Sequence, residues 1–251
     1  MNDKKHWDNI AENYDSEILN VFQANRDRKL ASFLQRHGGK RKVAIDFGCG
    51  IGNGFPHLAP LFKEVLALDI SPNCLEVAKQ KDYRNIKFGQ MDLTKPDIKV
   101  PVVDFVLCSN VALFPDVEKN YQVIRNVKAS LRPGGNALFV VPSLESMLFY
   151  GWRLIDWYRR EGVEAEKIDR TELNYYEVSK TDLLQGIIKI DDHPTKHYTE
   201  AELQVIFPTA GLKVTAIERL EYDWSTEFKS PPQWMKAPYP WDWLVESCND
   251  S

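Results

Sequence analysis

Short apolar runs alternate with helically spaced apolar positions along the first 141 residues of the chain. The apolar runs predict five strands, at about 42–47, 64–69, 86–88, 102–108 and 137–141. Helical spacing predicts helices at about 52–62, 71–82 and 117–131, preceded by one or two helices within 6–36. Alternation of strands and helices in this order predicts an α/β fold with a parallel sheet and right-handed crossovers.

After residue 143 the alternation is interrupted by an insertion at 144–198. A helix follows at 199–210, where Thr199 and Glu202 have the spacing of a capping box. A sixth strand is predicted at about 212–221 and a last strand at 241–246, joined by a connection at 223–240 that is rich in proline and tryptophan. The length of 251 residues fits a single domain, 1–251, that carries this insertion.

The first predicted strand runs into a turn with glycine at every second position. The turn contains Gly48, Gly50, Gly52 and Gly54, and the second strand closes on Asp69. Glycine lets a backbone approach a ligand closely and adopt angles closed to other residues. An acid at the end of the next strand can accept hydrogen bonds from the two hydroxyls of a ribose. The pattern predicts a nucleoside pocket at the carboxyl ends of the strands.

The turn departs from the dinucleotide fingerprint, which needs glycine at its sixth position. That position is Asn53 when counted from Gly48 and Phe55 when counted from Gly50. Asp46 would repel a pyrophosphate but suits a ligand with an amino group and a cationic centre. A glycine-rich turn without a ligand remains possible for the loop alone, and Asp69 argues against it.

Composition narrows the classes of partner. The apolar fraction of 43% and the charged fraction of 27% are ordinary for a soluble globular protein. The net charge of −4 argues against a dedicated nucleic-acid binder. No long uncharged apolar run suggests a membrane helix, and the start has no signal-peptide core. Four scattered cysteines form no C-x-x-C pair, which is typical of a reduced, cytoplasmic chain.

The acid and alternating glycines at Asp46, Gly48, Gly50 and Gly52 resemble the first motif of the class I S-adenosylmethionine-dependent methyltransferases, in particular those that act on small molecules. Further segments resemble the family in the expected order: Met91-Asp92-Leu93, Cys108-Ser109-Asn110, Leu131-Arg132-Pro133-Gly134-Gly135, and Trp7, Ala11 and Tyr14-Asp15 of an amino-terminal lid within 6–36. The resemblance implies a Rossmann-like, doubly wound, seven-stranded sheet. It is mostly parallel, with the last strand antiparallel and inserted between strands five and six.

The resemblance also implies a set of residues that bind S-adenosylmethionine. Asp69 would bind the ribose, Asp92 the exocyclic amino group of adenine, and Ser109 and Asn110 would lie beside the reacting methyl. The full set is Tyr14, Asp46, Gly48, Cys49, Gly50, Asp69, Ile70, Met91, Asp92, Leu93, Ser109 and Asn110. Each has a structural alternative: Asp92 could cap a turn, Asp69 could cap the following helix, and Tyr14 could belong to the core.

Methyl transfer from a sulfonium is an in-line displacement that needs alignment and exclusion of water, and it uses a base only when the acceptor carries a proton of high pKa. The candidates for such a base are Tyr14, His193 and His197. No metal is predicted, because Asp191, Asp192 and His193 are consecutive residues that would point to alternate sides of an extended segment.

Two segments outside the resemblance are candidates to surround the acceptor. Within the insertion one helical face carries Leu144, Met147, Leu148, Gly151, Leu154, Ile155 and Tyr158, which would cover the open end of the sheet or serve only for packing. Residues 221–251 carry six acids against two lysines, which would suit a cationic or amine acceptor if they line its site.

We therefore predict methyl transfer from S-adenosylmethionine to a small-molecule acceptor at N, O or C. The alternative is an accessory or regulatory protein that binds the cofactor without catalysis. Asn53 and Phe55 disfavour a nicotinamide-dependent oxidoreductase. The run Ser109-Asn110-Val111-Ala112 lacks the Asn-Pro-Pro-aromatic segment of the members that methylate bases and glutamine amides.

Overall fold

A seven-stranded sheet organises the chain. The structure is a computed structural model and describes residues 3–190 and 193–250. Its strands are β1 (Gly39–Phe47), β2 (Phe62–Asp69), β3 (Ile86–Gln90), β4 (Val103–Ser109), β5 (Leu131–Pro142), β8 (Lys213–Glu221) and β9 (Trp241–Cys248), in the order β3-β2-β1-β4-β5-β9-β8. Only β9 runs antiparallel, and it pairs with both β5 and β8. The predicted Rossmann-like sheet, with its last strand antiparallel and inserted, is confirmed.

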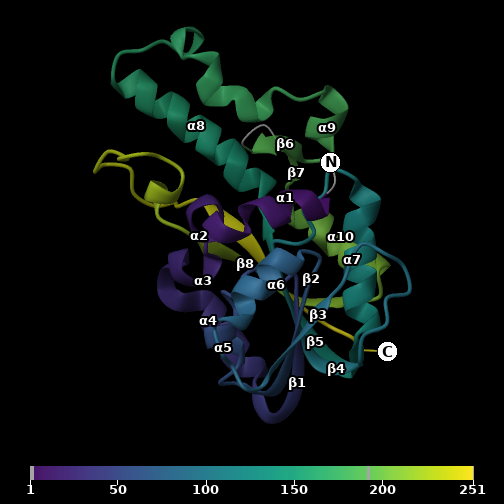
Figure 1. Cartoon of the computed structure of the whole chain (residues 1–251). Coiled ribbons are helices and arrows are strands. Elements are labelled where there is room, and N and C mark those ends of the chain that lie inside the picture. Colours follow the sequence, from purple (N-terminus) through teal and green to yellow (C-terminus); the bar gives the residue numbers. More distant parts are fainter. Residues whose placement is uncertain (1–2, 191–192, 251) are drawn as a thin grey trace.

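Helices cover both faces of the sheet (Figure 1). One layer contains α4 (Lys29–His37), α5 (Phe55–Leu58) and α6 (Pro72–Lys79), and the other contains α7 (Val117–Ala129) and α10 (Glu200–Thr209). Alternate strand residues face alternate layers: Phe47 belongs to the core beneath α7 and α10, and Ala44 to the core beneath α4. Both faces of the sheet therefore carry buried side chains.

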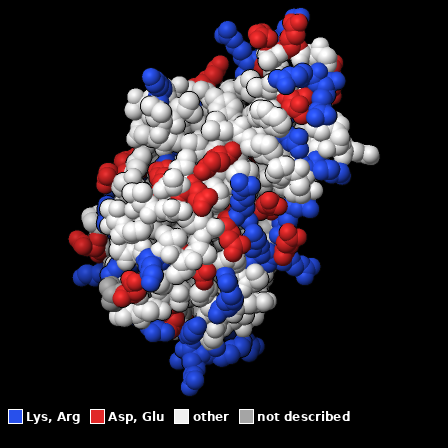
Figure 2. Space-filling model, turned by 180° about the vertical axis from the view of Figure 1, so that it is seen from behind, with Lys and Arg blue, Asp and Glu red and all other residues white. Residues whose placement is uncertain are grey.

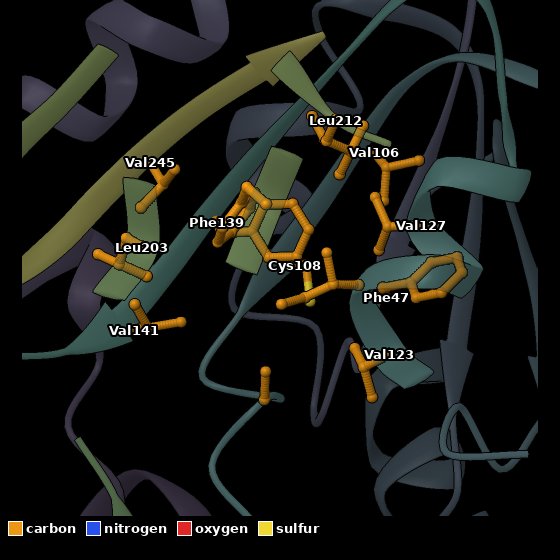
Figure 3. Close-up of a cluster of buried hydrophobic side chains, with 14 of the residues drawn as sticks. Phe47, Val106, Cys108, Val123, Val127, Phe139, Val141, Leu203, Leu212 and Val245 are labelled. Carbon is orange, nitrogen blue, oxygen red and sulfur yellow. The ribbon is translucent and has the colours of Figure 1, made fainter. Parts of the chain in front are cut away.

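The core under α7 and α10 is built from large side chains that interdigitate (Figure 3). Phe139 of β5 is fully buried and meets Phe207 of α10 edge to face, with ring centroids 4.8 Å apart. Full burial of a side chain of this size contributes about 1.5–3 kcal/mol relative to exposure. The same cluster includes Val106 and Cys108 of β4, so it joins β4 to β5, and the carboxyl ends of both strands form part of the candidate site.

The amino-terminal segment is more broken than the one or two helices that the pattern predicts. It consists of α1 (Asp3–Ile10), the 3₁₀ turn Ala11–Asn13, α2 (Tyr14–Glu17), α3 (Val21–Ala24) and the 3₁₀ turn Arg26–Arg28. The predicted segment 6–36 also includes most of α4, which packs against the sheet. The helix predicted at 52–62 is wrong in length, because α5 is a single turn that ends at Leu58, and Pro60 has no backbone N–H to continue the helical hydrogen bonds.

The insertion contains α8 (Leu144–Arg160), the 3₁₀ turns Ala165–Lys167 and Arg170–Tyr176, and α9 (Lys180–Leu184), and it ends in a hairpin of β6 (Ile187–Ile190) and β7 (His193–Lys196). The hairpin was not predicted. The insertion and α1 lie at the same end of the sheet (Figure 1). The predicted apolar face of α8 is wrong at Leu148, which is 52% exposed, whereas Gly151 and Leu154 are buried.

The connection 223–240 packs directly on α8. Tyr150 and Leu154 of α8 form one buried cluster with Trp224, Phe228 and Met235 of the connection. The rings of Tyr150 and Phe228 stack with centroids 4.8 Å apart. The two segments outside the family resemblance therefore form one aromatic layer, which holds both in place over the sheet.

The face opposite the view of Figure 1 carries no surface of a single charge. Figure 2 shows acidic and basic side chains interspersed over the face seen from behind, with basic side chains gathered at its lower end. None of the helices in residues 3–190 and 193–250 combines the length and apolar character that a membrane span requires.

Candidate functional site

The predicted cofactor residues gather along one edge of the sheet, where the parallel strands end; we call it the carboxyl edge. Strands β3, β2, β1 and β4 are neighbours in this order. Asp46 of β1 is in register with Ala67 of β2 and Leu107 of β4. Adjacent strands are about 4.8 Å apart, so the ends of β1 to β4 span a width that suits a nucleoside with a side chain. This edge is where ligands bind in open α/β sheets.

Asp69 ties the glycine turn to the start of α6. Its Oδ2 accepts the Gly50 N–H at 2.8 Å, and its Oδ1 accepts the Ser71 N–H at 2.8 Å. Ser71 itself caps α6, because its hydroxyl accepts the Cys74 N–H at 3.1 Å. The pKa of Asp69 is raised, since burial outweighs the hydrogen bonds that lower it. The carboxylate therefore has structural partners and still carries lone pairs for a ligand.

Asp46 is a buried carboxylate without a partner. Only 4% of it is exposed, and none of the described residues gives it a hydrogen bond or an ion pair. Burial, together with the charge of Asp69, raises its pKa to about 7. An unpaired charge in such surroundings is costly unless a ligand of opposite charge neutralises it. The environment of Asp46 therefore suits a cationic group.

Asn110 is a second polar group that lacks a partner at this edge. It follows β4, adopts a positive φ of 54°, and its Oδ1 is buried with no hydrogen-bond partner among the described residues. The backbone N–H of Asn110 donates to Val140 of β5 at 2.9 Å, which fixes the end of β4. A polar ligand at this edge could therefore supply a partner of opposite charge for Asp46 and a hydrogen bond to Asn110 Oδ1.

The amino-terminal segment lies over the glycine turn. A Cβ atom on Gly50 would lie 2.8 Å from the Tyr14 hydroxyl, so this glycine permits the close approach. Burial raises the pKa of Tyr14, and the nearby charge of Asp69 adds to the effect. Helix α1 is held on α6, because the Ser71 hydroxyl donates to Asp8 Oδ1 at 2.6 Å. The predicted lid therefore contacts the turn through Tyr14.

The other predicted cofactor residues differ in their surroundings. Asp92 accepts hydrogen bonds from the backbone and hydroxyl of Thr94, at 3.0 and 2.6 Å, as its structural alternative expected. The side chains of Cys49 and Leu93 belong to the two sheet cores. Their backbone still lies at the carboxyl edge, next to Gly48, Ile70, Met91 and Ser109. Binding of the cofactor by these residues stays a prediction.

The two candidate histidines are in different environments. His193 is exposed, and its ring lies 5.2 Å from that of His6 in α1. His197 is only 3% exposed, and its Nδ1 donates to the Thr195 carbonyl at 3.1 Å. Burial lowers the pKa of His197 to about 4, so its ring is neutral at physiological pH. His197 is thus a hydrogen-bond acceptor through Nε2 and a weak base.

A small cavity at the carboxyl edge contains residues that the sequence did not single out. Its volume is about 60 Å³, and its lining includes His197, Tyr222, Glu227 and Asp242. Tyr222 follows β8, Glu227 belongs to the connection, and Asp242 is the second residue of β9. The excess of acids after residue 221 was the available signal, but it did not distinguish these two carboxylates from those that face solvent. Within residues 3–190 and 193–250 no cluster of His, Cys, Asp and Glu could hold a metal; Asp191 and Asp192 lie outside the described residues.

Gly48→Ala is expected to destabilise the chain at least twice as much as Gly134→Ala. Both glycines have a positive φ, 74° and 72°, so both substitutions carry the same backbone strain of about 1–2 kcal/mol. Only at Gly48 would a Cβ clash, 2.3 Å from Val111, whereas nothing lies within 4 Å at Gly134. Thermal unfolding measures both, with a loss of about 3–6 °C expected for Gly134→Ala. Equal losses would show that Val111 moves aside easily.

The sheet order and the acid–glycine turn are those expected from the resemblance to the class I S-adenosylmethionine-dependent methyltransferases. Residues 44–135 match the family model described as a methyltransferase domain. A probable S-adenosylmethionine-dependent methyltransferase of Saccharomyces cerevisiae is 26% identical over 142 residues, which are 53% of this chain and 43% of that protein. A malonyl-[acyl-carrier protein] O-methyltransferase of Paenibacillus sp. is 26% identical over 134 residues, 49% of this chain and 47% of that protein.

Among solved structures, the N-methyltransferase NodS of Bradyrhizobium japonicum in complex with S-adenosyl-L-homocysteine has a TM-score of 0.62 at 16% identity, with both chains fully covered. The matches span about half the length of the curated relatives. The sequence-based recognition is supported by these comparisons: residues 44–135 match a methyltransferase domain, the relatives are named as methyltransferases, and the solved structure has the same fold.

Proposed function

We propose that this protein transfers a methyl group from S-adenosylmethionine to a small-molecule acceptor. The observation that carries the proposal is Asp46, a buried carboxylate without a partner, beside a glycine turn that Asp69 ties to α6. A dinucleotide would bring its phosphates to this carboxylate and would be repelled. A ligand with an ammonium group would instead neutralise it, and S-adenosylmethionine carries one.

Each residue of the edge has a role in this proposal. Asp69 accepts hydrogen bonds from the ribose hydroxyls, as the acid at this position does in nucleoside sites. Asp46 pairs with the ammonium group of the methionyl part, and Asn110 supplies a polar contact near the end of β4. Tyr14 closes over Gly50 and keeps water away. The bound cofactor supplies a methyl group on a positively charged sulfur.

A small acceptor is supported by the cover over the carboxyl edge. Helix α8 and the connection 223–240 share one aromatic cluster, and the cavity beneath them holds about 60 Å³. Leu19 of the amino-terminal segment also lines this cavity, five residues after Tyr14. The lid, the insertion and the connection therefore converge where an acceptor would meet the cofactor. A space of this size favours a small group over a polymer surface.

Calorimetry and turnover together test the proposal. We expect S-adenosylhomocysteine to bind with one site per chain and NADH not to bind. With methyl-labelled S-adenosylmethionine and a metabolite extract, we expect label to appear in a small-molecule fraction. Absence of binding by correctly folded protein would contradict the cofactor assignment. Binding without transfer to any acceptor would support the alternative, an accessory protein without catalysis.

A further inference from the structure

The small cavity at the carboxyl edge has an unusual set of polar groups. Asp242 and Glu227 both line it, together with the neutral ring of His197. None of its described lining residues is lysine or arginine. Lys196, next to His197, is already engaged, because its Nζ donates to Glu202 at 2.7 Å and to the His197 carbonyl at 2.9 Å. The two carboxylates therefore share a cavity without a protein cation.

Asp242, Glu227 and His197 each have one acceptor atom without a hydrogen-bond partner among the described residues. Asp242 Oδ2 accepts the Tyr222 hydroxyl at 2.7 Å, which leaves Oδ1. Glu227 Oε1 accepts the Thr226 hydroxyl at 3.1 Å, which leaves Oε2. The Nδ1–H of His197 is bound to the Thr195 carbonyl, which leaves the lone pair of Nε2. The three residues that carry these acceptors come from three segments and line one cavity.

The charges in the cavity are uncompensated. Burial raises the pKa of Asp242 to about 7, and the neighbouring charge of Glu227 contributes to the increase. Burial also raises the pKa of Glu227. Two carboxylates that repel each other in a partly buried space are stabilised by a bound cation that donates several hydrogen bonds. An ammonium group has this charge and up to three N–H donors.

We propose that the acceptor of this enzyme is a small amine, whose ammonium group binds in the cavity between Asp242 and Glu227 and donates a hydrogen bond to His197 Nε2. The inference rests on the proposed function, since it identifies the substrate of the same site. The cavity volume of about 60 Å³ holds an ammonium group with one or two adjacent carbons, and the rest of the acceptor lies outside it. Tyr222, 2% exposed, positions Asp242 through its hydroxyl.

Two probes of equal size test this assignment: ethylammonium chloride and ethanol. After S-adenosylhomocysteine binding has been measured by calorimetry, thermal unfolding of the complex is followed with each probe at 100 mM, at constant chloride. We expect ethylammonium to raise the midpoint by about 3 °C over sodium chloride, which corresponds to a Kd on the order of 10 mM, and ethanol to have no such effect. Equal shifts with the two probes would overturn the proposal.

Variants localise the effect. Asp242→Asn and Glu227→Gln are each expected to weaken ethylammonium binding at least fivefold. Glu221→Gln is the matched control, because Glu221 precedes Tyr222 but is not among the residues described as lining the cavity. Retention of full binding by both cavity variants would place the amine elsewhere and overturn the proposal. If either variant fails to fold, the comparison of the two probes on the unmodified chain still decides.

The experiment separates the inference from the proposed function. Binding of S-adenosylhomocysteine without a preference for ethylammonium overturns the amine site and leaves methyl transfer standing. Absence of S-adenosylhomocysteine binding overturns the proposed function. The two probes are then compared on the protein alone, where a preference lost in Asp242→Asn supports the amine site and its absence overturns it.

Discussion

Asp69→Asn is expected to weaken S-adenosylhomocysteine binding about 100-fold. In the proposed complex Asp69 accepts hydrogen bonds from two ribose hydroxyls while it holds the Gly50 N–H at 2.8 Å. An asparagine can accept through only one of its two terminal atoms. Hydrogen bonds to a charged acceptor contribute about 1.5–3 kcal/mol each, and the loss of one or two corresponds to a Kd increase of roughly 10–10⁴-fold. Isothermal titration calorimetry measures the change directly.

Asp104→Asn is the matched control for this prediction. Asp104 also accepts a backbone N–H, that of Val43 at 2.8 Å, but it lies near the start of β4, away from the carboxyl edge. It pairs with Arg132 at 2.7 Å, so its replacement should lower stability without changing affinity for the ligand. Unchanged binding by Asp69→Asn would contradict its assigned role. Equal weakening by both variants would show that the effect is a general loss of structure.

The parallel half of the sheet could be predicted because its signals are local. Each of its strands is an apolar run of a few residues, and Asp46, the glycines and Asp69 follow from two consecutive strand ends. The position of β9 between β5 and β8 came from the family resemblance, since pairing between strands 100 residues apart leaves no local pattern. The grouping of Asp46, the glycines and Asp69 at the carboxyl edge was predictable for the same reason as the strands, because these residues are near one another in sequence.

The elements that were missed depend on tertiary contacts. The hairpin of β6 and β7 has only four residues in each strand, too few for a clear periodicity. Leu148 has helical apolar spacing yet is exposed, because the connection 223–240 packs on Tyr150 and Leu154 instead. Sequence alone places these segments outside the family pattern but does not say which of their faces meet.

The small cavity at the carboxyl edge was missed for a related reason. His197, Tyr222, Glu227 and Asp242 come from separate segments, and only the fold brings them together. His197 was considered as a base, but burial lowers its pKa to about 4 and favours a role as a neutral acceptor. The excess of acids near the carboxyl terminus indicated acidic residues in this region, and the structure shows that Glu227 and Asp242 line the cavity.

Asp46→Asn is expected to stabilise the ligand-free protein above pH 7 and to weaken cofactor binding at the same time. The pKa of Asp46 is about 7 in the folded chain, whereas the ordinary value is 3.8. Between these values the folded state keeps a proton that the unfolded state has released, so stability falls as pH rises from about 4 to 7 and is then constant. The cost at pH 8 is on the order of 4 kcal/mol, and asparagine removes it because it does not titrate.

Denaturant unfolding at pH 5 and pH 8 of the ligand-free chain and the variant measures this cost. Raised pKa values of Asp69, Asp242 and Glu227 lower the stability of both proteins at high pH. The difference between the two curves of stability against pH therefore isolates Asp46. Asp104→Asn is expected to change stability in the opposite direction, because hydrogen bonds from Val43 and Arg132 lower the pKa of Asp104 more than burial raises it. That variant should lose stability above pH 4.

Ligand binding then links the two effects of Asp46. A cationic group that pairs with Asp46 recovers part of the energy lost by burying the carboxylate, so S-adenosylhomocysteine should stabilise the unmodified chain more than the variant at pH 8. We expect the affinity of Asp46→Asn to be at least tenfold lower, about 1.4 kcal/mol or more. Parallel stability profiles in the two proteins, or equal affinity, would show that Asp46 has a partner that the folded chain itself supplies. The combination of higher stability and weaker binding is the result that a site built for a cation requires.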